Sequence, residues 1–131
     1  MSKPVILCVD DEKVVLDSLK SQLKQAFGDK YFYEMAEDGA DALDAIQELM
    51  EDSIPIVMIV SDWLMPGMKG DELLIRIHQQ YPNIVKIMLT GQAEPSAIER
   101  AKQEANLSFC LHKPWSEEEL VTAIQASLAK L

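Results

Sequence analysis

The sequence predicts an α/β domain in which a five-stranded parallel sheet lies between two layers of helices, a three-layer sandwich. Five short apolar runs alternate along the chain with longer segments that repeat apolar residues at helical spacing. Strands that alternate with helices pair in parallel through right-handed crossovers, and their helices then cover both faces of the sheet. No internal repeat or linker interrupts the alternation, so we expect residues 1–131 to form one domain around one core.

The first half of the chain predicts two strands, each followed by a helix. Val5–Val9 is continuously apolar, as is typical of a strand covered on both faces. Apolar residues then recur at helical spacing over 16–27, and Gly28 ends this helix. A run of mixed polarity and several aromatic residues over 31–36 predicts a strand nearer the sheet edge. An amphipathic helix over 42–50 follows it.

The second half predicts the remaining strands and helices. Further strands are expected over 54–60, 84–89 and 107–111, and the first of these is the most apolar run in the chain. A third helix covers 73–77, a fourth opens at Pro95, and a last one follows Ser116. Ser116 and Glu119 fit a capping box, in which serine and glutamate side chains accept hydrogen bonds from free backbone amides.

Composition narrows the class of partner. The chain has 131 residues, a hydrophobic content of 48% and a formal net charge of −10. Nucleic acid and anionic membranes need positive charge on the protein, so we expect neither as a direct partner. No signal peptide or membrane span is evident, which predicts a cytoplasmic protein. An acidic surface instead suits binding to other proteins.

The two cysteines lie in apolar runs. Cys8 and Cys110 fall in segments that predict central strands, and they form no CxxC pair or metal-ligand cluster. We therefore expect buried, reduced thiols without a zinc or redox role.

Polar residues close four of the five apolar runs, and these residues carry the chemistry. Asp10 and Asp11 follow the first run, Asp62 the third, Thr90 the fourth and Lys113 the fifth. In open parallel sheets ligands bind beyond the carboxyl ends of the strands, so these side chains should meet at one edge. Neighbouring carboxylates repel one another unless a cation such as Mg²⁺ binds, and that ion would also neutralise an incoming phosphoryl group. The set predicts a phosphoryl-transfer site.

Four motifs in this order resemble those of the receiver domain of two-component response regulators, over essentially the whole chain. They are Val-Asp-Asp at 9–11, Asp-Trp-Leu-Met-Pro at 62–66 with Gly70 beyond, Thr-Gly at 90–91 and Lys-Pro at 113–114. The resemblance implies a flavodoxin-like fold with strand order 2-1-3-4-5. It also implies a signalling module rather than an enzyme.

The resemblance assigns roles to the site residues. Asp62 is implied as the phosphoacceptor, which takes a phosphoryl group from a sensor histidine kinase or a phosphotransfer protein. Asp11, Asp62 and the backbone carbonyl of Leu64 would ligate Mg²⁺, while Asp10 would hold a metal-bound water. Because Trp63 follows the phosphoacceptor, we expect it to be partly exposed beside the metal.

Three further residues are implied to respond to the phosphoryl group. Lys113 would pair with one of its oxygens as a compact point charge. The bond between Lys113 and Pro114 is cis in the family, and X-Pro bonds have only a small preference for trans. Thr90 would move to donate a hydrogen bond to the phosphoryl group.

One position departs from the family pattern. Receivers place Tyr or Phe three residues before the lysine, as a switch coupled to the threonine, but this chain has Cys110 there. By strand alternation Phe109 points to the other face of the sheet. The phosphorylation chemistry is unaffected, whereas the way in which it is read out is in doubt.

Two other functions stay open. A pseudo-receiver would bind partners without accepting phosphate, and Cys110 keeps this alternative open. A magnesium-dependent phosphatase of the haloacid dehalogenase type would use an aspartyl phosphate. It needs a second aspartate two residues after its nucleophile, whereas Glu12 stands in that place after Asp10. The output domain or downstream protein, and the formation of a homodimer, are also left open by the sequence.

Overall fold

The computed structural model describes residues 3–91 and 94–130, and within them five parallel strands form a single sheet. The strands lie in the order β2-β1-β3-β4-β5, which confirms the predicted fold class and strand order. Their bounds are β1 Val5–Val9, β2 Phe32–Ala36, β3 Ile56–Asp62, β4 Val85–Thr90 and β5 Phe109–His112.

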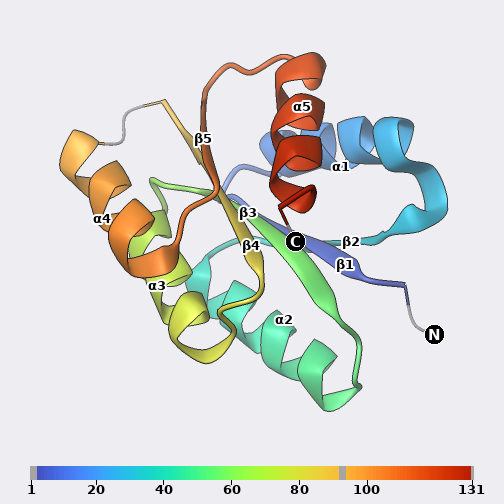
Figure 1. Cartoon of the computed structure of the whole chain (residues 1–131), viewed down its shortest axis with the longest axis horizontal. Coiled ribbons are helices and arrows are strands. Elements are labelled where there is room, and N and C mark those ends of the chain that lie inside the picture. The colour runs from blue at the N-terminus through green and yellow to red at the C-terminus, as the bar shows by residue number, and fades with distance from the viewer. Residues whose placement is uncertain (1–2, 92–93, 131) are drawn as a thin grey trace.

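Helices cover both faces of the sheet, with α1 and α5 on one side and α2, α3 and α4 on the other (Figure 1). Their bounds are α1 Lys13–Phe27, α2 Gly39–Glu51, α3 Gly70–Gln80, α4 Pro95–Ala105 and α5 Glu117–Leu128, and a 3₁₀ turn, η1, covers Gly28–Lys30. The central strands β1 and β3 are therefore buried on both sides, which explains the apolar sequences of β1 and of Ile56–Val60 in β3.

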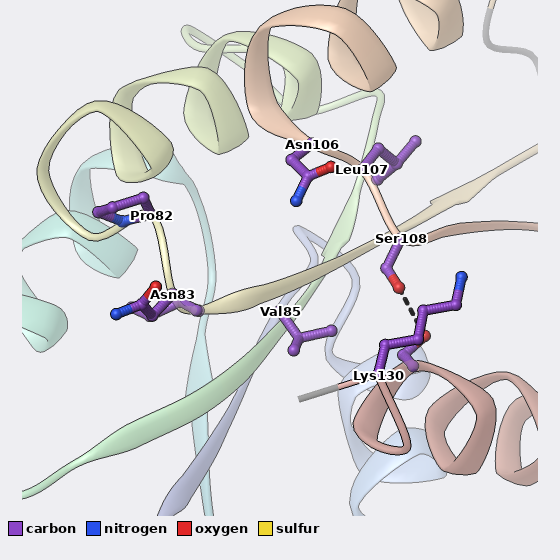
Figure 2. Close-up of a pocket in the computed structure, with 9 residues that line it drawn as sticks. Pro82, Asn83, Val85, Asn106, Leu107, Ser108 and Lys130 are labelled. Carbon is purple, nitrogen blue, oxygen red and sulfur yellow. Dashed lines mark hydrogen bonds between the residues drawn. The ribbon is translucent and has the colours of Figure 1, made fainter.

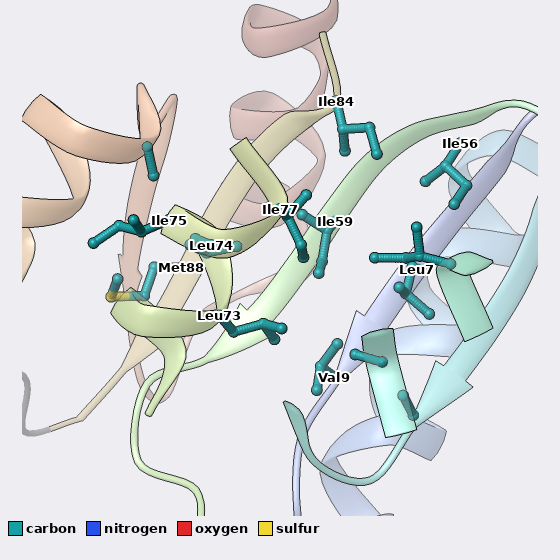
Figure 3. Packing of buried hydrophobic residues seen from close by; sticks show 14 of the residues in the cluster. Leu7, Val9, Ile56, Ile59, Leu73, Leu74, Ile75, Ile77, Ile84 and Met88 are labelled. Carbon is teal, nitrogen blue, oxygen red and sulfur yellow. The ribbon is translucent and has the colours of Figure 1, made fainter. Parts of the chain in front are cut away.

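Strand alternation divides the buried side chains into two clusters. Leu7, Val9 and Ile59 face α2 and α3, where they pack with Leu73 and Leu74 (Figure 3). Residues one position along, such as Cys8, face α1 and α5. Burial on both sides fixes the register of the central strands, because a slip by one residue would exchange the two faces.

The strands begin and end up to two residues later than the sequence predicts. β5 begins at Phe109 rather than 107, because Asn106 adopts a left-handed conformation (φ 52°) that ends α4. The Leu107 amide still donates to the carbonyl of Ala101 at 3.2 Å. At the other end, Asp62 and Thr90 are the last residues of β3 and β4, whereas the predicted strands end at 60 and 89. Their side chains are thus held by the sheet itself.

The expectation that Cys110 lies in a central strand is wrong. Among the residues that the structure describes, β5 pairs with β4 alone and is an edge strand, so Cys110 is only half-buried. Cys8, in contrast, lies in β1 and is buried, and this burial raises the pKa of its thiol to about 12. Both thiols are free.

The predicted capping box at the start of α5 is confirmed. Ser116 Oγ accepts from the amide of Glu119 at 3.1 Å, and Glu119 Oε1 accepts from the amide of Ser116 at 3.2 Å. These bonds fix the point at which the chain turns into α5, two residues after Pro114. No helix in the described parts of the chain is both long and apolar enough to span a membrane.

Candidate functional site

Three carboxylates meet at the carboxyl edge of the sheet. Single oxygens of Asp10, Asp11 and Asp62 all lie within 4.8 Å of one another. Asp10 directly follows β1 and is fully buried, Asp62 ends β3 at 4% exposure, and Asp11 is exposed. Because β1 and β3 are paired neighbours, their ends are adjacent, and this adjacency brings together acids that are distant in the sequence.

Lys113 is the cation of the cluster. Its Nζ lies 3.1 Å from Asp10 Oδ2 and 3.1 Å from Asp62 Oδ1. Asp10 Oδ1 accepts a further hydrogen bond from the amide of Glu12 at 2.9 Å, so both of its oxygens are engaged. Asp11 has no ion pair with a described residue, and its exposed carboxylate is directed to the cavity above the strands.

Electrostatics favour a second cation in the cluster. Burial raises the pKa of Asp62; the hydrogen bond from Lys113 opposes this effect, and the charges of Asp10 and Asp11 add to it. Burial alone would lower the pKa of Lys113, but its bonds to Asp10 and Asp62 outweigh burial and raise it. Three acids against one ammonium leave excess negative charge, which a hard, oxygen-ligated cation would neutralise.

The cluster opens into a hollow of about 260 Å³ at the surface. Leu64, half-exposed at 50%, stands on one side of it, and Thr90, buried to 1%, lies on another. The amide of Lys113 donates to the carbonyl of Thr90 at 2.8 Å, which holds the loop after β5 against the end of β4. The Lys113–Pro114 bond is cis, as the resemblance implies. The hollow is lined by Asp11, Glu12, Asp62, Leu64, Thr90, Gly91 and Lys113.

A larger hollow of about 460 Å³ lies at the opposite, amino ends of β4 and β5 (Figure 2). Ser108 Oγ donates to Ser127 Oγ there at 2.9 Å, but no Asp or Glu of the described residues lines the hollow. Size therefore does not identify the chemical site, whereas the convergence of charged groups does. The lining residues are Pro82, Asn83, Ile84, Val85, Asn106, Leu107, Ser108, Ser127 and Lys130.

The expectation that Trp63 is partly exposed beside the metal is wrong. Trp63 is 7% exposed and packs in the cluster between the sheet and α2, α3 and α4. Its Nε1 donates to Asp71 Oδ1 at 3.1 Å, and Lys69 Nζ lies 4.8 Å from its ring centroid. The partner Asp71 could not be found from the sequence, because it resembles any acid in the first turn of a helix.

Gly70 has a structural role that the motif alone does not explain. A Cβ at this position would lie 2.3 Å from the backbone oxygen of Asp62 and 2.8 Å from the Cα of Trp63. The Gly70 amide donates to the carbonyl of Trp63 at 2.7 Å. The start of α3 is thus packed directly on the backbone that carries Asp62, at a distance that only glycine permits.

The sequence matches the family model "Response regulator receiver domain" over residues 6–125. The chain belongs to this receiver family. Curated relatives include the hydrogenase transcriptional regulatory protein HoxA of Cupriavidus necator, 28% identical over 123 residues, and the sensor kinase CckA of Brucella abortus, 29% identical over 129 residues. The alignments cover 94% and 98% of this chain but only 24% and 13% of those proteins, respectively.

Solved structures of receivers have the same fold. The signal receiver domain of an HD domain-containing protein from Pseudomonas fluorescens superposes with a TM-score of 0.84 at 34% identity, covering 98% of this chain and 96% of that one. The chemotaxis protein CheY4 of Vibrio cholerae superposes with a TM-score of 0.81 at 26% identity, covering 96% and 99%. This chain is therefore a receiver of two-component signal transduction in fold and sequence.

Cys110 lies on an edge strand, but it faces the side of the sheet that strand alternation predicts. Cys110 packs against the cluster on the α3 and α4 side, while Phe109 is 43% exposed and lines a groove beside α5. The two side chains thus face opposite sides of β5. The thiol is too small to replace an aromatic ring between the threonine and the outer surface.

Proposed function

We propose that this receiver accepts a phosphoryl group on Asp62 in a magnesium-dependent reaction and thereby changes its interactions with other proteins. The observation that carries the proposal is the position of Lys113 Nζ, 3.1 Å from Asp62 Oδ1 at the rim of an open hollow. Of the three clustered acids, Asp62 alone is both buried and part of the lining of the hollow, where it lies with Lys113 and Thr90.

The residues present fit a magnesium ion. Asp11 and Asp62 offer carboxylate oxygens, and Leu64 belongs to the same lining, where its backbone carbonyl would complete the protein ligands. Asp10, already bonded to Lys113 and Glu12, is suited to hold a bound water rather than the ion directly. When bound, Mg²⁺ neutralises charge on the acids and on the phosphoryl oxygens.

Asp62 acts as the nucleophile. One of its carboxylate oxygens forms a bond to phosphorus while the bond from phosphorus to the donor's histidine nitrogen breaks, and the electron pair of that bond leaves with the imidazole. A carboxylate is a modest nucleophile, so position and charge neutralisation supply the rate. Lys113 would exchange its contact with Asp62 for one with a phosphoryl oxygen, and the hydroxyl of Thr90 would donate to another.

The donor on this proposal is a sensor histidine kinase or a phosphotransfer protein. The relatives support this context, since one is named a sensor kinase and another a transcriptional regulatory protein. The proposal also includes an output domain or downstream protein as a partner, and a homodimer. A pseudo-receiver remains the second candidate, since Cys110 departs from the pattern on which the usual readout depends.

The test is labelling by acetyl phosphate with Mg²⁺, followed by intact mass measurement. We expect a single phosphate per chain, stable to acid and labile to base, that is lost in Asp62→Asn and in EDTA. Asp17→Asn, which changes an exposed acid on α1, is the matched control and should label normally. Undiminished labelling of Asp62→Asn would refute the assignment, and no labelling of the wild type would favour the pseudo-receiver. In a separate assay, turnover of a small phosphomonoester far beyond one equivalent would indicate a phosphatase.

A further inference from the structure

The residue after the phosphoacceptor is connected to α3 by a buried hydrogen bond. Trp63 Nε1 donates to Asp71 Oδ1 at 3.1 Å, and both residues are 7% exposed. An indole N–H and a carboxylate in such a position need partners, because neither can reach bulk water freely. The bond therefore fixes the orientation of the Trp63 ring relative to α3.

The backbone reinforces this connection. The amide of Gly70 donates to the carbonyl of Trp63 at 2.7 Å. The backbone oxygen of Asp62 occupies the space next to the Gly70 Cα in which a Cβ would stand. Packed interiors transmit small displacements because they cannot deform continuously. A shift of the β3 end on phosphorylation of Asp62 would accordingly displace the first turn of α3, which holds Asp71.

The second oxygen of Asp71 reaches α4. Arg100 Nη1 lies 3.3 Å from Asp71 Oδ2, and Arg100 Nε lies 3.1 Å from Glu104 Oε2 one turn farther along the same helix. The helices α3 and α4 lie side by side (Figure 1). Asp71 is thus a carboxylate with one oxygen bonded to the phosphoacceptor loop and the other to α4.

We propose that Asp71 is a positioning residue that couples the state of Asp62 to α4 through Trp63 and Arg100. The inference rests on the proposed phosphorylation of Asp62. It supplies a connection that Cys110 is too small to make through β5. Helix α4 is suited to respond, because its fully buried side chains are only those of Ala101 and Ala105, so it can shift or open at low cost.

The test uses beryllofluoride with Mg²⁺, a stable mimic of the acyl phosphate. Hydrogen exchange is measured in α4 with and without the mimic, while ¹⁹F resonances of bound beryllofluoride report occupancy of Asp62. The main variant is Arg100→Gln, since Arg100 has a side chain 49% exposed and its loss should not prevent folding. Trp63→Phe removes the indole donor but keeps an aromatic ring at this position, and Arg100→Lys keeps the positive charge.

A matched control is available on α3. Arg76 pairs with Glu72 at 3.1 Å across one turn, and both side chains are about as exposed as that of Arg100. Arg76→Gln therefore removes a surface ion pair of the same kind without touching Asp71. It should leave the response of α4 at the wild-type level.

We expect the mimic to change the opening equilibrium of α4 in the wild type by roughly fivefold or more, and in Arg100→Gln or Trp63→Phe by less than about twofold. Arg100→Lys should show a response between those of Arg100→Gln and the wild type. The double variant with Arg100→Gln and Trp63→Phe should respond no less than either single variant, because both substitutions interrupt the same connection. These variants should still bind the mimic at saturation.

Two outcomes separate this inference from the proposed function. If the wild type fails to bind beryllofluoride at Asp62, the proposed function is overturned, and this inference with it. If the mimic binds and α4 responds equally in wild type, Arg100→Gln and Trp63→Phe, the coupling through Asp71 is overturned while the proposed function stands. A strong response of β5 with none in α4 would likewise refute the inference alone.

Discussion

The ammonium of Lys113 lies 3.1 Å from the carboxylate of Asp62 and at the same distance from that of Asp10. A single cation is therefore shared between two buried acids, with a third, Asp11, beside them. Removal of charge from this cluster and addition of a second cation should both stabilise the fold, and each effect can be measured.

Replacement of Asp62 by Asn should raise the stability of the protein in EDTA, by an amount on the order of 1 kcal/mol. Burial and the neighbouring acids raise the pKa of Asp62, so the folded state binds a proton more readily than the unfolded state. Stability from this group is therefore fully present at low pH and lost as the pH rises through the folded pKa. Urea unfolding at neutral pH measures the effect, and a variant less stable than wild type would contradict it. Asp17→Asn is the control for loss of a negative charge.

Magnesium should stabilise the wild type by about 1–3 kcal/mol when present at roughly ten to a hundred times its dissociation constant. The ion would bind only the folded cluster, because its acids are dispersed in the unfolded chain. Asp11→Asn and Asp62→Asn should show much less of this gain, because each removes a carboxylate from the cluster. Melting curves of the wild type and both variants across a magnesium titration measure this stabilisation. An equal gain in both variants would place the ion elsewhere.

Gly70→Ala should destabilise the protein by about 1–3 kcal/mol or more, since overpacking against backbone forces atoms to move. The added Cβ would stand 2.3 Å from the backbone oxygen of Asp62, and no flexible side chain can give way there. Gly91→Ala is the matched control, because among the described residues its Cβ would meet only the Lys113 Cβ, at 3.8 Å. Chemical unfolding compares the two variants. A Gly70→Ala protein as stable as Gly91→Ala would mean that α3 can move away from β3 without cost.

Lys86 should make stability depend on pH in the alkaline range. It lies in β4 at 1% exposure, with Nζ bonded to the carbonyl of Ile84 at 2.6 Å, and burial lowers its pKa to about 8 from 10.5. Between these values the unfolded state binds more protons, so this contribution to stability rises with pH from about 8 to 10.5.

Lys86→Met, which retains most of the side-chain volume, tests this contribution. The stability of the variant minus that of wild type should fall by about 1–3 kcal/mol between pH 7 and pH 10. Lys24→Met, at an exposed lysine on α1, should show a smaller change. A difference between Lys86→Met and wild type that is constant with pH would indicate that Lys86 is charged in the fold without penalty.

The sequence by itself determined the fold class and which polar side chains meet at the carboxyl edge of the sheet. Alternating strands and helices imply a parallel sheet, and in a parallel sheet all strands end at one edge. Asp10, Asp62, Thr90 and Lys113 each follow or end an apolar run, so their convergence could be predicted from local pattern alone. The same reasoning placed Cys110 and Phe109 on opposite faces of one strand.

Only the tertiary structure decided which long-range partners these elements find. Trp63 turns inward to Asp71, and Asp71 meets Arg100 from another helix, because α3 and α4 pack side by side on the same face. The burial of Lys86 in β4 likewise depends on how other elements pack around it. Periodicity reports which face of an element is apolar, but it carries no information on which charged side chain a neighbouring helix presents to it. These long-range contacts follow from the distance and angle at which the helices pack.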